Sequence, residues 1–237
     1  MLVSVIIPTL NEAETIQAAI KAARRDYPPD QVEIVVADGG STDGTLDLVP
    51  EHATVDAAPR GRGVQMNRGA AVSGGQILVF CHADSQLPSG WREAVIDALA
   101  DPQVSGGTFQ TLMLPERGFL LWLRNHMVFT ADWRGLYGDQ VQFMRRETFE
   151  RVGGFPEIPL MEDLEMSRAL YQVGRLVRIS PRLRVITSSR RFLERGVLRQ
   201  WLLNVRNVIW YLYLGASPED IASSYRSSRE EALCADD

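Results

Sequence analysis

Short apolar runs alternate with stretches of helical character along the first third of the chain. Four runs are rich in Val, Ile, Leu and Ala: 2–8, 32–38, 53–58 and 76–84. Nearly continuous apolar runs of this length are typical of parallel strands that are buried on both faces. Between them, 12–25 repeats apolar residues at helical spacing, and 61–75 is typical of a loop that leads into a helix. The alternation predicts an α/β fold with a doubly wound parallel sheet.

Two polar positions mark expected helix starts. Asn11 and Glu14 stand at the spacing of a helix-start signature, in which the first side chain caps the helix. Asp43 follows a Gly-Gly-Ser-Thr turn and is expected to cap a short helix over 43–49.

The second half of the chain has a less regular pattern. The alternating residues 105–114 predict one strand, and 175–189 predicts one or two strands interrupted at Pro181. A strand followed by a short helix is expected over 138–156. Further helices are expected over 118–133, 160–174 and 196–215.

The helices around Trp122 and Trp201 are the most apolar of the chain. We expect both to pack in the core. For one of them the alternative is a peripheral contact with a membrane surface, although Arg199, Asn204 and Arg206 interrupt its apolar face.

Composition narrows the class of protein. With 237 residues, 45% hydrophobic and 23% charged, the chain is long enough for one large α/β domain. Its net charge of −5 argues against a nucleic-acid partner. Every basic residue except Lys21 is an arginine, whose planar guanidinium suits phosphate, although a genomic base bias would give the same result.

Cysteine use and hydropathy bear on the cellular compartment. The sequence contains Cys81 and Cys234, opens without a basic leader, and has no stretch of about 18 uninterrupted apolar residues. We therefore expect a protein of the reducing cytoplasm, with association at the inner face of the membrane as an alternative.

Three predicted strands end in polar residues: Pro8-Thr9-Leu10-Asn11-Glu12, Asp38 to Asp43, and His82-Ala83-Asp84. Ligands of doubly wound sheets bind outside the carboxyl ends of the strands, so these residues should meet at one edge. The first loop has no glycine, which argues against a Rossmann dinucleotide site. Thr9, Asn11 and Glu12 could bond a base or a ribose, or could simply cap the helix. Capping explains Asp43 well and Asp38 poorly.

Four segments in this order resemble the family 2 glycosyltransferases of GT-A fold: SVIIPTLNEAETI, VVADGGSTDGT, GRGVQMNRGAAVSGGQILVFCHAD and LMEDLEMSRAL. The resemblance covers about residues 2–175. Details such as HAD and SSRRFLERGVLRQWLLN further resemble a bacterial subgroup associated with radical-SAM and arsenosugar biosynthesis genes.

The resemblance also implies an architecture. It is a Rossmann-like three-layer sandwich with a mainly parallel central sheet and C-terminal helices. Residues 1–237 would form one GT-A domain. A nucleotide-binding half would reach about residue 84, an acceptor-binding half would span about 85–195, and the C-terminal helices would span about 196–232.

Nucleotide-binding roles follow from the same resemblance. Asp38 would bond the uracil, or another base, from the end of its strand. The remaining nucleotide contacts would be Pro8, Thr9, Asn11, Glu12, Arg62, Gln65, Asn67, His82, Arg190 and Arg191. Arg190 and Arg191 suit a diphosphate because each guanidinium can bond two oxygens, or they could form a solvated basic turn.

The HAD segment is implied to hold a divalent cation. Asp84 would take the metal-binding place of an Asp-x-Asp motif in which His82 replaces the first acid. Either Mn²⁺ or Mg²⁺ would serve, and the histidine favours Mn²⁺ because Mg²⁺ prefers oxygen ligands.

Glu162 and Asp163 begin a predicted helix, where acids are also favoured by the helix dipole. The resemblance implies that Asp163 is the general base, supported by Glu162. The reaction would be an inverting transfer of a sugar from a UDP-linked donor to a hydroxyl acceptor. Asp139 and Gln140 would line the wall around the acceptor or the donor sugar.

Two other classes of protein stay open. A nucleotidyltransferase would need a basic, glycine-rich loop after the first strand, whereas PTLNEAET is acidic and lacks glycine. A non-catalytic protein that binds sugar nucleotides is favoured by the histidine in HAD, and it would bind a donor without turnover.

Overall fold

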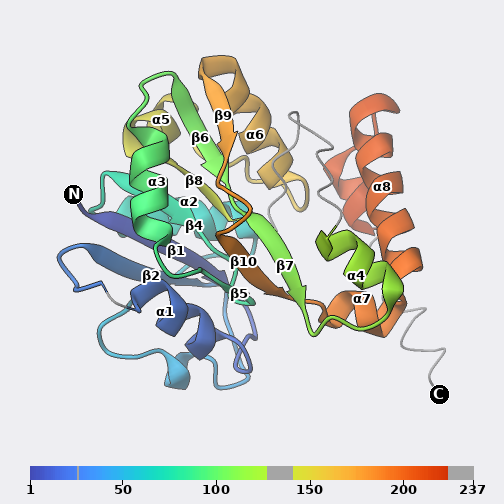
Figure 1. Ribbon diagram of the computed structural model, residues 1–237, viewed down its shortest axis with the longest axis horizontal. Helices are drawn as coiled ribbons and strands as arrows, with labels where there is room; N and C mark the ends of the chain where they lie inside the picture. Colours follow the sequence, from blue (N-terminus) through green and yellow to red (C-terminus); the bar gives the residue numbers. More distant parts are fainter. Residues whose placement is uncertain (26, 127–140, 224–237) are drawn as a thin grey trace.

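The central sheet contains most of the strands. The computed structural model describes residues 1–25, 27–126 and 141–223 (Figure 1). Within them, seven strands form this sheet in the order β3 (Thr54–Ala57), β2 (Val32–Asp38), β1 (Val3–Thr9), β4 (Ile77–Phe80), β8 (Gln142–Arg145), β6 (Val104–Thr108) and β9 (Arg175–Arg178). Neighbours pair in parallel except at β8, which is antiparallel to β4 and β6. The expected α/β class with a mainly parallel sheet is confirmed.

The carboxyl ends of β1, β2 and β4 lie at one edge. Thr9 is opposite Asp38 in the pair of β1 and β2. Phe80 is opposite Ile6, and the N–H of Cys81 donates to the Ile6 carbonyl at 3.0 Å, so residues 82–84 flank the end of β1. The three polar strand ends therefore share an edge, as their sequence positions predicted.

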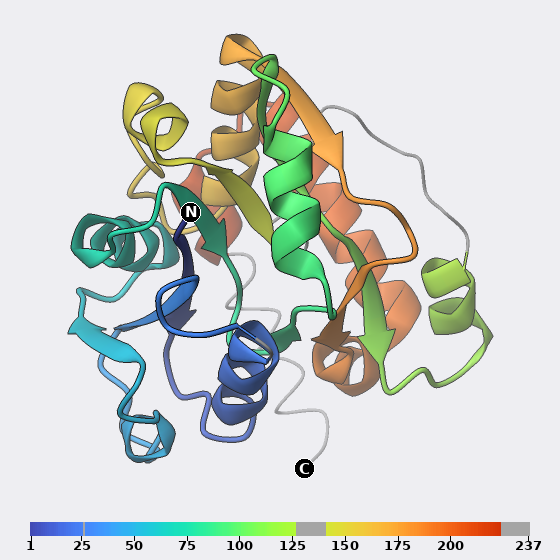
Figure 2. The ribbon, with the colours of Figure 1, turned by 60° about the vertical axis from the view of Figure 1, so that its left-hand side comes forward.

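Helices cover both faces of this sheet (Figures 1 and 2). The side chains of Val3, Val5 and Ile7 face one core, shared with α1 (Ile16–Arg24) and α3 (Trp91–Leu99). Ile6, on the other face of β1, packs in a second core with α2 (Arg62–Val72), α5 (Arg146–Arg151) and α6 (Glu162–Val173). The alternation of β1 thus supports two helical layers, which gives a three-layer sandwich.

The prediction of a single strand over 105–114 was wrong. Phe109 interrupts it, because its fully buried ring packs edge-on against Phe143 with 5.8 Å between centroids. On one side of Phe109, β6 stays in the central sheet. On the other, β7 (Gln110–Leu114) joins β10 (Arg184–Ser188) and β5 (Ser85–Gln86) in a second sheet. Residues 175–189 accordingly contribute two strands, β9 and β10.

The start of the first helix also differs from the prediction. The flanking residue of α1 is Thr15, which makes no side-chain cap hydrogen bond. Asn11 instead has a φ of 55° and accepts a hydrogen bond from the Thr42 N–H at 2.9 Å. The Asn11 side chain is used by the neighbouring loop, which precedes a short 3-10 helix, η1 (Leu46–Leu48).

The apolar helices lie at the far end of the molecule from α1. They are α4 (Phe119–His126) and α8 (Val197–Tyr213), and α8 is preceded by α7 (Arg190–Arg195). The expectation that Trp122 and Trp201 lie in the core was wrong, because they are 45% and 47% exposed. The fully buried residues of α8 are Gln200 and Asn207, and Trp210 and Tyr211 are partly buried. Most of its other large apolar side chains are exposed.

Candidate active site

The loops that follow β1 and β2 are bound to each other. The N–H of Asn11 donates to Ser41 Oγ at 2.9 Å, and the N–H of Ala13 donates to Asp43 Oδ2 at 3.1 Å. With the bond from Thr42 to the Asn11 side chain, these contacts join the two loops into one wall of the edge. Asn11 and Asp43 therefore shape this wall.

Asp38 is almost completely buried at the end of β2. Its Oδ2 accepts hydrogen bonds from the N–H groups of Gly40 at 2.9 Å and Ser41 at 3.0 Å, and its Oδ1 accepts from Ser41 Oγ at 2.5 Å. These bonds hold the loop over residues 39–41. Contact between Asp38 and a base stays a prediction.

Gln65 and Asn67, both on α2, bond to backbone. Gln65 Nε2 donates to the carbonyls of Thr9 at 2.7 Å and Ala37 at 2.8 Å, so it ties the ends of β1 and β2. Asn67 Nδ2 donates to the Phe155 carbonyl at 2.8 Å and its Oδ1 accepts from the Phe155 N–H at 2.9 Å. The structure gives both side chains a positioning task, and their contact with a nucleotide stays a prediction.

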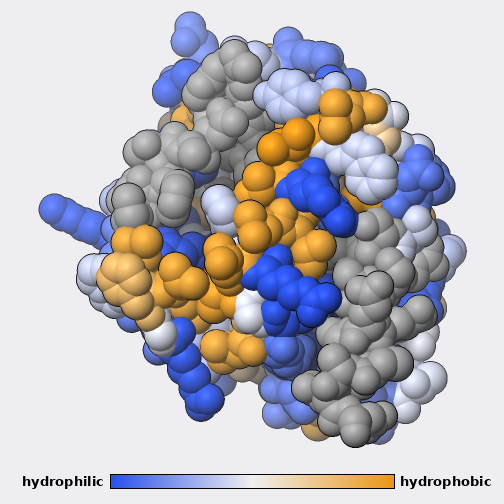
Figure 3. Space-filling model, turned by 90° about the vertical axis from the view of Figure 1, so that its right-hand side faces the viewer, coloured by the Kyte–Doolittle hydropathy of each residue, from blue (hydrophilic) through white to orange (hydrophobic). Residues whose placement is uncertain are grey.

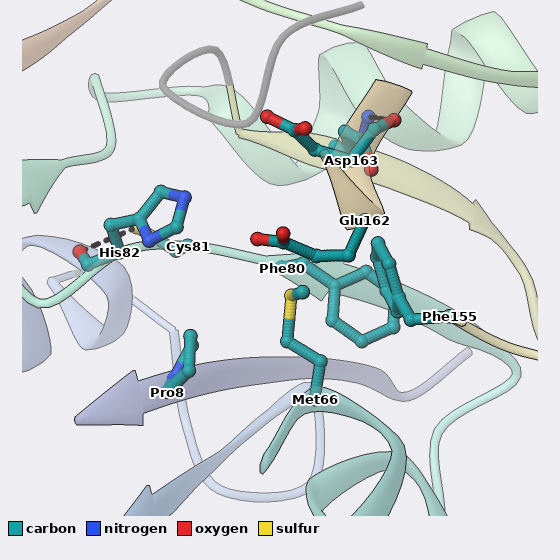
Figure 4. Close-up of a pocket in the computed structure, with 9 residues that line it drawn as sticks. Pro8, Met66, Phe80, Cys81, His82, Phe155, Glu162 and Asp163 are labelled. Atoms are coloured by element: carbon teal, nitrogen blue, oxygen red, sulfur yellow. Dashed lines mark hydrogen bonds between the residues drawn. The ribbon is translucent and has the colours of Figure 1, made fainter. Parts of the chain in front are cut away.

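Glu162, at the start of α6, pairs with Arg62, at the start of α2. Arg62 Nε lies 2.7 Å from Glu162 Oε1 in an ion pair whose atoms are not aligned as a hydrogen bond. Burial raises the pKa of Glu162, the Arg62 charge lowers that pKa, and the Asp163 charge raises it further. Figure 4 shows the Glu162 carboxylate pointing to the His82 side of a cavity of about 10 Å³, room for roughly one water molecule. The cavity is lined by Pro8, Met66, Phe80, Cys81, His82, Gln142, Phe155, Glu162 and Asp163.

The charges of four other predicted site residues act on the pKa of His82. Burial and the Arg62 charge lower the pKa of its imidazole, the carboxylates of Asp84 and Asp163 raise that pKa, and Arg191 lowers it. Burial comes first among these causes, so the net direction is downward and the neutral ring is favoured. Residues from four separate segments thus lie within electrostatic reach of one imidazole.

Glu12 connects the first loop to the same cluster. Burial raises its pKa, a hydrogen bond from Thr15 lowers it, the Asp84 charge raises it, and Arg190 and Arg191 lower it. Arg190 is exposed and lies 3.3 Å from Glu14, whereas the charge of Arg191 also reaches His82. Both arginines are exposed and both act on Glu12, and Arg191 also acts on His82.

Asp163 stands in the first turn of α6. Its Oδ1 accepts a hydrogen bond from the Leu164 N–H at 2.7 Å, and its carbonyl accepts from Gln142 Nε2 at 3.0 Å. Met161, the residue before α6 begins, has a φ of 72°, which is a strained conformation for a side chain of this size. Such strain gathers at functional sites.

Sequence reasoning missed Met161 and Gln142 as site residues. Gln142 is buried, and its amide also donates to Ser167 Oγ at 3.0 Å. The available signal was a lone amide inside the apolar strand VQFM. Asp139 and Gln140, the predicted wall around acceptor or sugar, lie outside the described residues.

A divalent cation was expected at His82 and Asp84. In the described ranges, no group of three or more His, Cys, Asp or Glu side chains is arranged to hold a metal ion. Mg²⁺ and similar ions are often held by one or two carboxylates together with substrate phosphates. Two side chains at one strand end fit that mode of binding, in which the nucleotide supplies the other oxygens.

The fold is that of GT-A proteins, with a mainly parallel central sheet and helices on both faces. The first turn of α6 carries Glu162 and Asp163 next to the polar strand ends. TarS 1–349 of S. aureus is similar with a TM-score of 0.61 at 21% identity, over 88% of this chain and 65% of that one. Mannosyltransferase PcManGT of Pyrobaculum calidifontis, in complex with GDP-Man and Mn²⁺, has a TM-score of 0.59 at 24% identity, over 86% and 64%.

The chain belongs to glycosyl transferase family 2, whose model matches residues 4–155, more than half of its length. It is 29% identical over 170 residues to Glycosyltransferase AglE of Haloferax volcanii, covering 65% of this chain and 56% of that protein. It is 28% identical over 196 residues to Succinoglycan biosynthesis protein ExoA of Rhizobium meliloti, covering 72% and 58%. The chain thus spans just over half the length of these curated relatives.

Proposed function

We propose that this protein is an inverting glycosyltransferase that moves a sugar from a UDP-linked donor to a hydroxyl acceptor. The observation that supports it best is the cavity at the strand ends that His82, Glu162 and Asp163 line together. The charges of Arg62, Asp84 and Arg191 also act on His82. This arrangement offers positive charge for a diphosphate and a carboxylate for proton removal at the same edge. Membership of glycosyl transferase family 2 agrees with it.

Asp163 is the proposed general base. Its carboxylate takes the proton of the acceptor hydroxyl while that oxygen attacks C1 of the donor sugar. The bond between C1 and the diphosphate oxygen breaks, and its electron pair leaves with the diphosphate. Attack from the side opposite the leaving group inverts the anomeric centre. Glu162, next to the base and paired with Arg62, supports the site.

The nucleotide is proposed to lie over the ends of β1 and β2. Asp38 would contact the base, and Arg191 would contact the diphosphate. TarS has been solved with UDP and with UDP-GlcNAc, whereas PcManGT was solved with GDP-Man. The UDP preference of this chain is therefore a proposal that needs direct measurement.

A divalent cation held by Asp84 and His82 would offset the negative charge that develops on the diphosphate. The Mn²⁺ in the PcManGT complex supports this proposal by analogy. Because histidine is a better ligand for Mn²⁺ than for Mg²⁺, we propose Mn²⁺ as the better activator.

The finer parts of the resemblance are also proposals. They are the division near residues 84 and 195, the subgroup associated with radical-SAM and arsenosugar genes, and a place in the cytoplasm. Each is consistent with the order of motifs along the chain.

Transfer and hydrolysis of UDP-sugars should both collapse in Asp163→Asn and in Asp84→Asn. The anomeric configuration of the product, read by NMR, should be opposite to that of the donor. Full activity in both variants would exclude the mechanism. Nucleotide binding without turnover in the wild type would favour the non-catalytic binding protein instead.

A thermal-shift panel identifies the donor base and the metal. UDP, GDP, CDP and dTDP are each added with Mg²⁺, Mn²⁺ or a chelator. A bound ligand stabilises the folded state by mass action, so UDP with Mn²⁺ should give the largest shift. Equal shifts with the chelator would contradict the proposed metal.

A further inference from the structure

The helix α8 exposes its apolar side chains in a single stripe. Leu198, Trp201, Leu202, Ile209 and Tyr213 follow one another at helical spacing, and each is between 46% and 73% exposed. From Leu198 to Tyr213 the stripe is about 22 Å long. An ordinary surface helix turns such a stripe toward the core, whereas the stripe of α8 faces the solvent.

The opposite side of α8 combines two buried amides with the partly buried rings of Trp210 and Tyr211, which pack against a hydrophobic cluster around Leu164. Gln200 and Asn207 are 2% and 3% exposed. Gln200 Nε2 donates to Asn204 Oδ1 at 2.8 Å, and Arg206 donates to Asn207 Oδ1 through Nη2 at 3.1 Å. Because Gln200 and Asn207 have hydrogen-bond partners, their burial does not leave these polar groups unsatisfied.

The stripe continues onto α4, which packs against α8. The exposed apolar residues of both helices form a surface that we call the apolar face: Phe119, Leu120, Trp122, Leu198, Trp201, Leu202, Ile209, Leu212, Tyr213 and Leu214. Figure 3 shows this surface as a broad hydrophobic area interrupted by hydrophilic side chains. Contiguous exposed apolar areas of this kind mark sites of interaction.

The charge near the apolar face has the opposite sign to that of the whole molecule. Helix α8 contains Arg199 and Arg206 and no acid, a net charge of +2, whereas the chain carries −5. Arg199 and Arg206 line an open groove of about 500 Å³ on α8 together with Leu198, Leu202 and Leu203. Cationic and apolar groups therefore occur together along one helix.

We propose that the apolar face docks on an anionic membrane surface, with α8 lying in the plane of the interface. Helices of this kind place leucine and tryptophan below the headgroups and arginine among them. A second copy of the chain is disfavoured, because it would bring one cationic face against another. In the described part of the chain, no helix has the length and apolar content needed to span a bilayer.

Co-sedimentation with vesicles tests the proposal with the full chain. The vesicles are phosphatidylcholine alone or with about a quarter phosphatidylglycerol. The wild type should partition about tenfold more strongly onto the anionic vesicles, and high salt should weaken the binding. The double variant Trp201→Gln, Leu202→Gln should lose about tenfold in partitioning, because it removes apolar area that the membrane would bury.

The matched control is Val55→Gln, Val72→Gln, which changes two valines that are each 46% exposed on β3 and α2. It should bind vesicles as the wild type does. Circular dichroism checks that all variants fold, and quenching of wild-type tryptophan by brominated lipid reports insertion without any substitution. Quenching is the expected result, and its absence would overturn the proposal.

Two further outcomes would also overturn it. The first is equal partitioning of the wild type and the α8 double variant. The second is a wild-type dimer in sedimentation velocity that the same substitutions convert to a monomer, which would make the apolar face an interface between copies.

Discussion

The edge formed by β1, β2 and β4 and the outer side of α8 arrange polar and apolar groups in opposite ways. At the edge, apolar strands are buried and their polar ends are bound to one another, as Asn11 is to Ser41 and Thr42. On α8, polar Gln200 and Asn207 are buried and leucines face outward. The loops at the edge find hydrogen-bond partners within the protein, whereas the outer side of α8 exposes apolar side chains. The comparison separates side chains that are hydrogen-bonded within the protein from apolar side chains that the protein leaves exposed.

The largest effect is expected from Asp163→Asn. Loss of a general base lowers transfer by about 10²- to 10⁴-fold, measured as kcat with saturating donor and acceptor. The unfolding midpoint in urea should stay close to that of the wild type, since Asp163 is partly exposed. A large loss of stability would instead show that this acid has a structural role and would weaken the contrast between the two regions.

Two tryptophans compare the regions directly. Trp91 is fully buried and its Nε1 donates to the Ala23 carbonyl at 3.2 Å, so Trp91→Ala should lower the free energy of unfolding by about 3–5 kcal/mol. Trp201→Ala should change it by at most about 1 kcal/mol, because the ring is 47% exposed. Urea denaturation measures both values. Equal losses would mean that the outer side of α8 is packed like a core.

Asn67→Ala tests whether the edge depends on its backbone ties. The substitution removes two hydrogen bonds to Phe155 and should lower the free energy of unfolding by about 2 kcal/mol. The matched control is Arg68→Ala, which removes an exposed ion pair with Asp56 at 3.3 Å and should cost no more than about 1 kcal/mol. Both values come from urea curves in the absence of ligand. Equal losses of unfolding free energy in the two variants would mean that the Asn67–Phe155 hydrogen bonds stabilise the fold no more than an exposed ion pair does.

The smallest effect concerns the dependence of stability on pH. Burial raises the pKa of Glu162 above its ordinary value of 4.5, so the folded state holds this proton more tightly than the unfolded chain does. Its stabilising contribution is complete below the unfolded pKa and is lost as the pH rises through the folded pKa. The advantage of Glu162→Gln over the wild type in urea unfolding should therefore grow as the pH rises above 4.5. An advantage that shrinks would mean that attraction to Arg62 outweighs burial.

Much of the fold was predictable because its signals are local. The apolar runs at 2–8 and 32–38 have no alternation, which is typical of strands between two helical layers. Because parallel strands end at the same edge of a sheet, Asp38, His82 and Asp84 could be placed at one edge. The break of 105–114 at Phe109 had no such signal at the break itself, since Gly106 and Gly107 lie inside β6 and no glycine or proline stands at Phe109.

Side-chain partners and exposure were harder to predict. Gln65 and Asn67 have the composition of ligand contacts, but each bonds to backbone far away in sequence, and such partners are set by tertiary packing. The orientation of α8 was mistaken because an apolar stripe predicts burial without saying against what. Only the burial of Gln200 and Asn207 on the other side shows which way the stripe points.

The antiparallel strand of the central sheet, β8, has a consequence for the order of synthesis. Residues 1–80 emerge from the ribosome first and contain β1 to β4, yet the outer side of β4 pairs only with β8, residues 142–145. Asn67 likewise waits for Phe155. Until that stretch is translated, the nascent chain exposes an unpaired strand edge, a hazard for aggregation. The part of the molecule that is made first thus stays incomplete until residues 142–155 have been made.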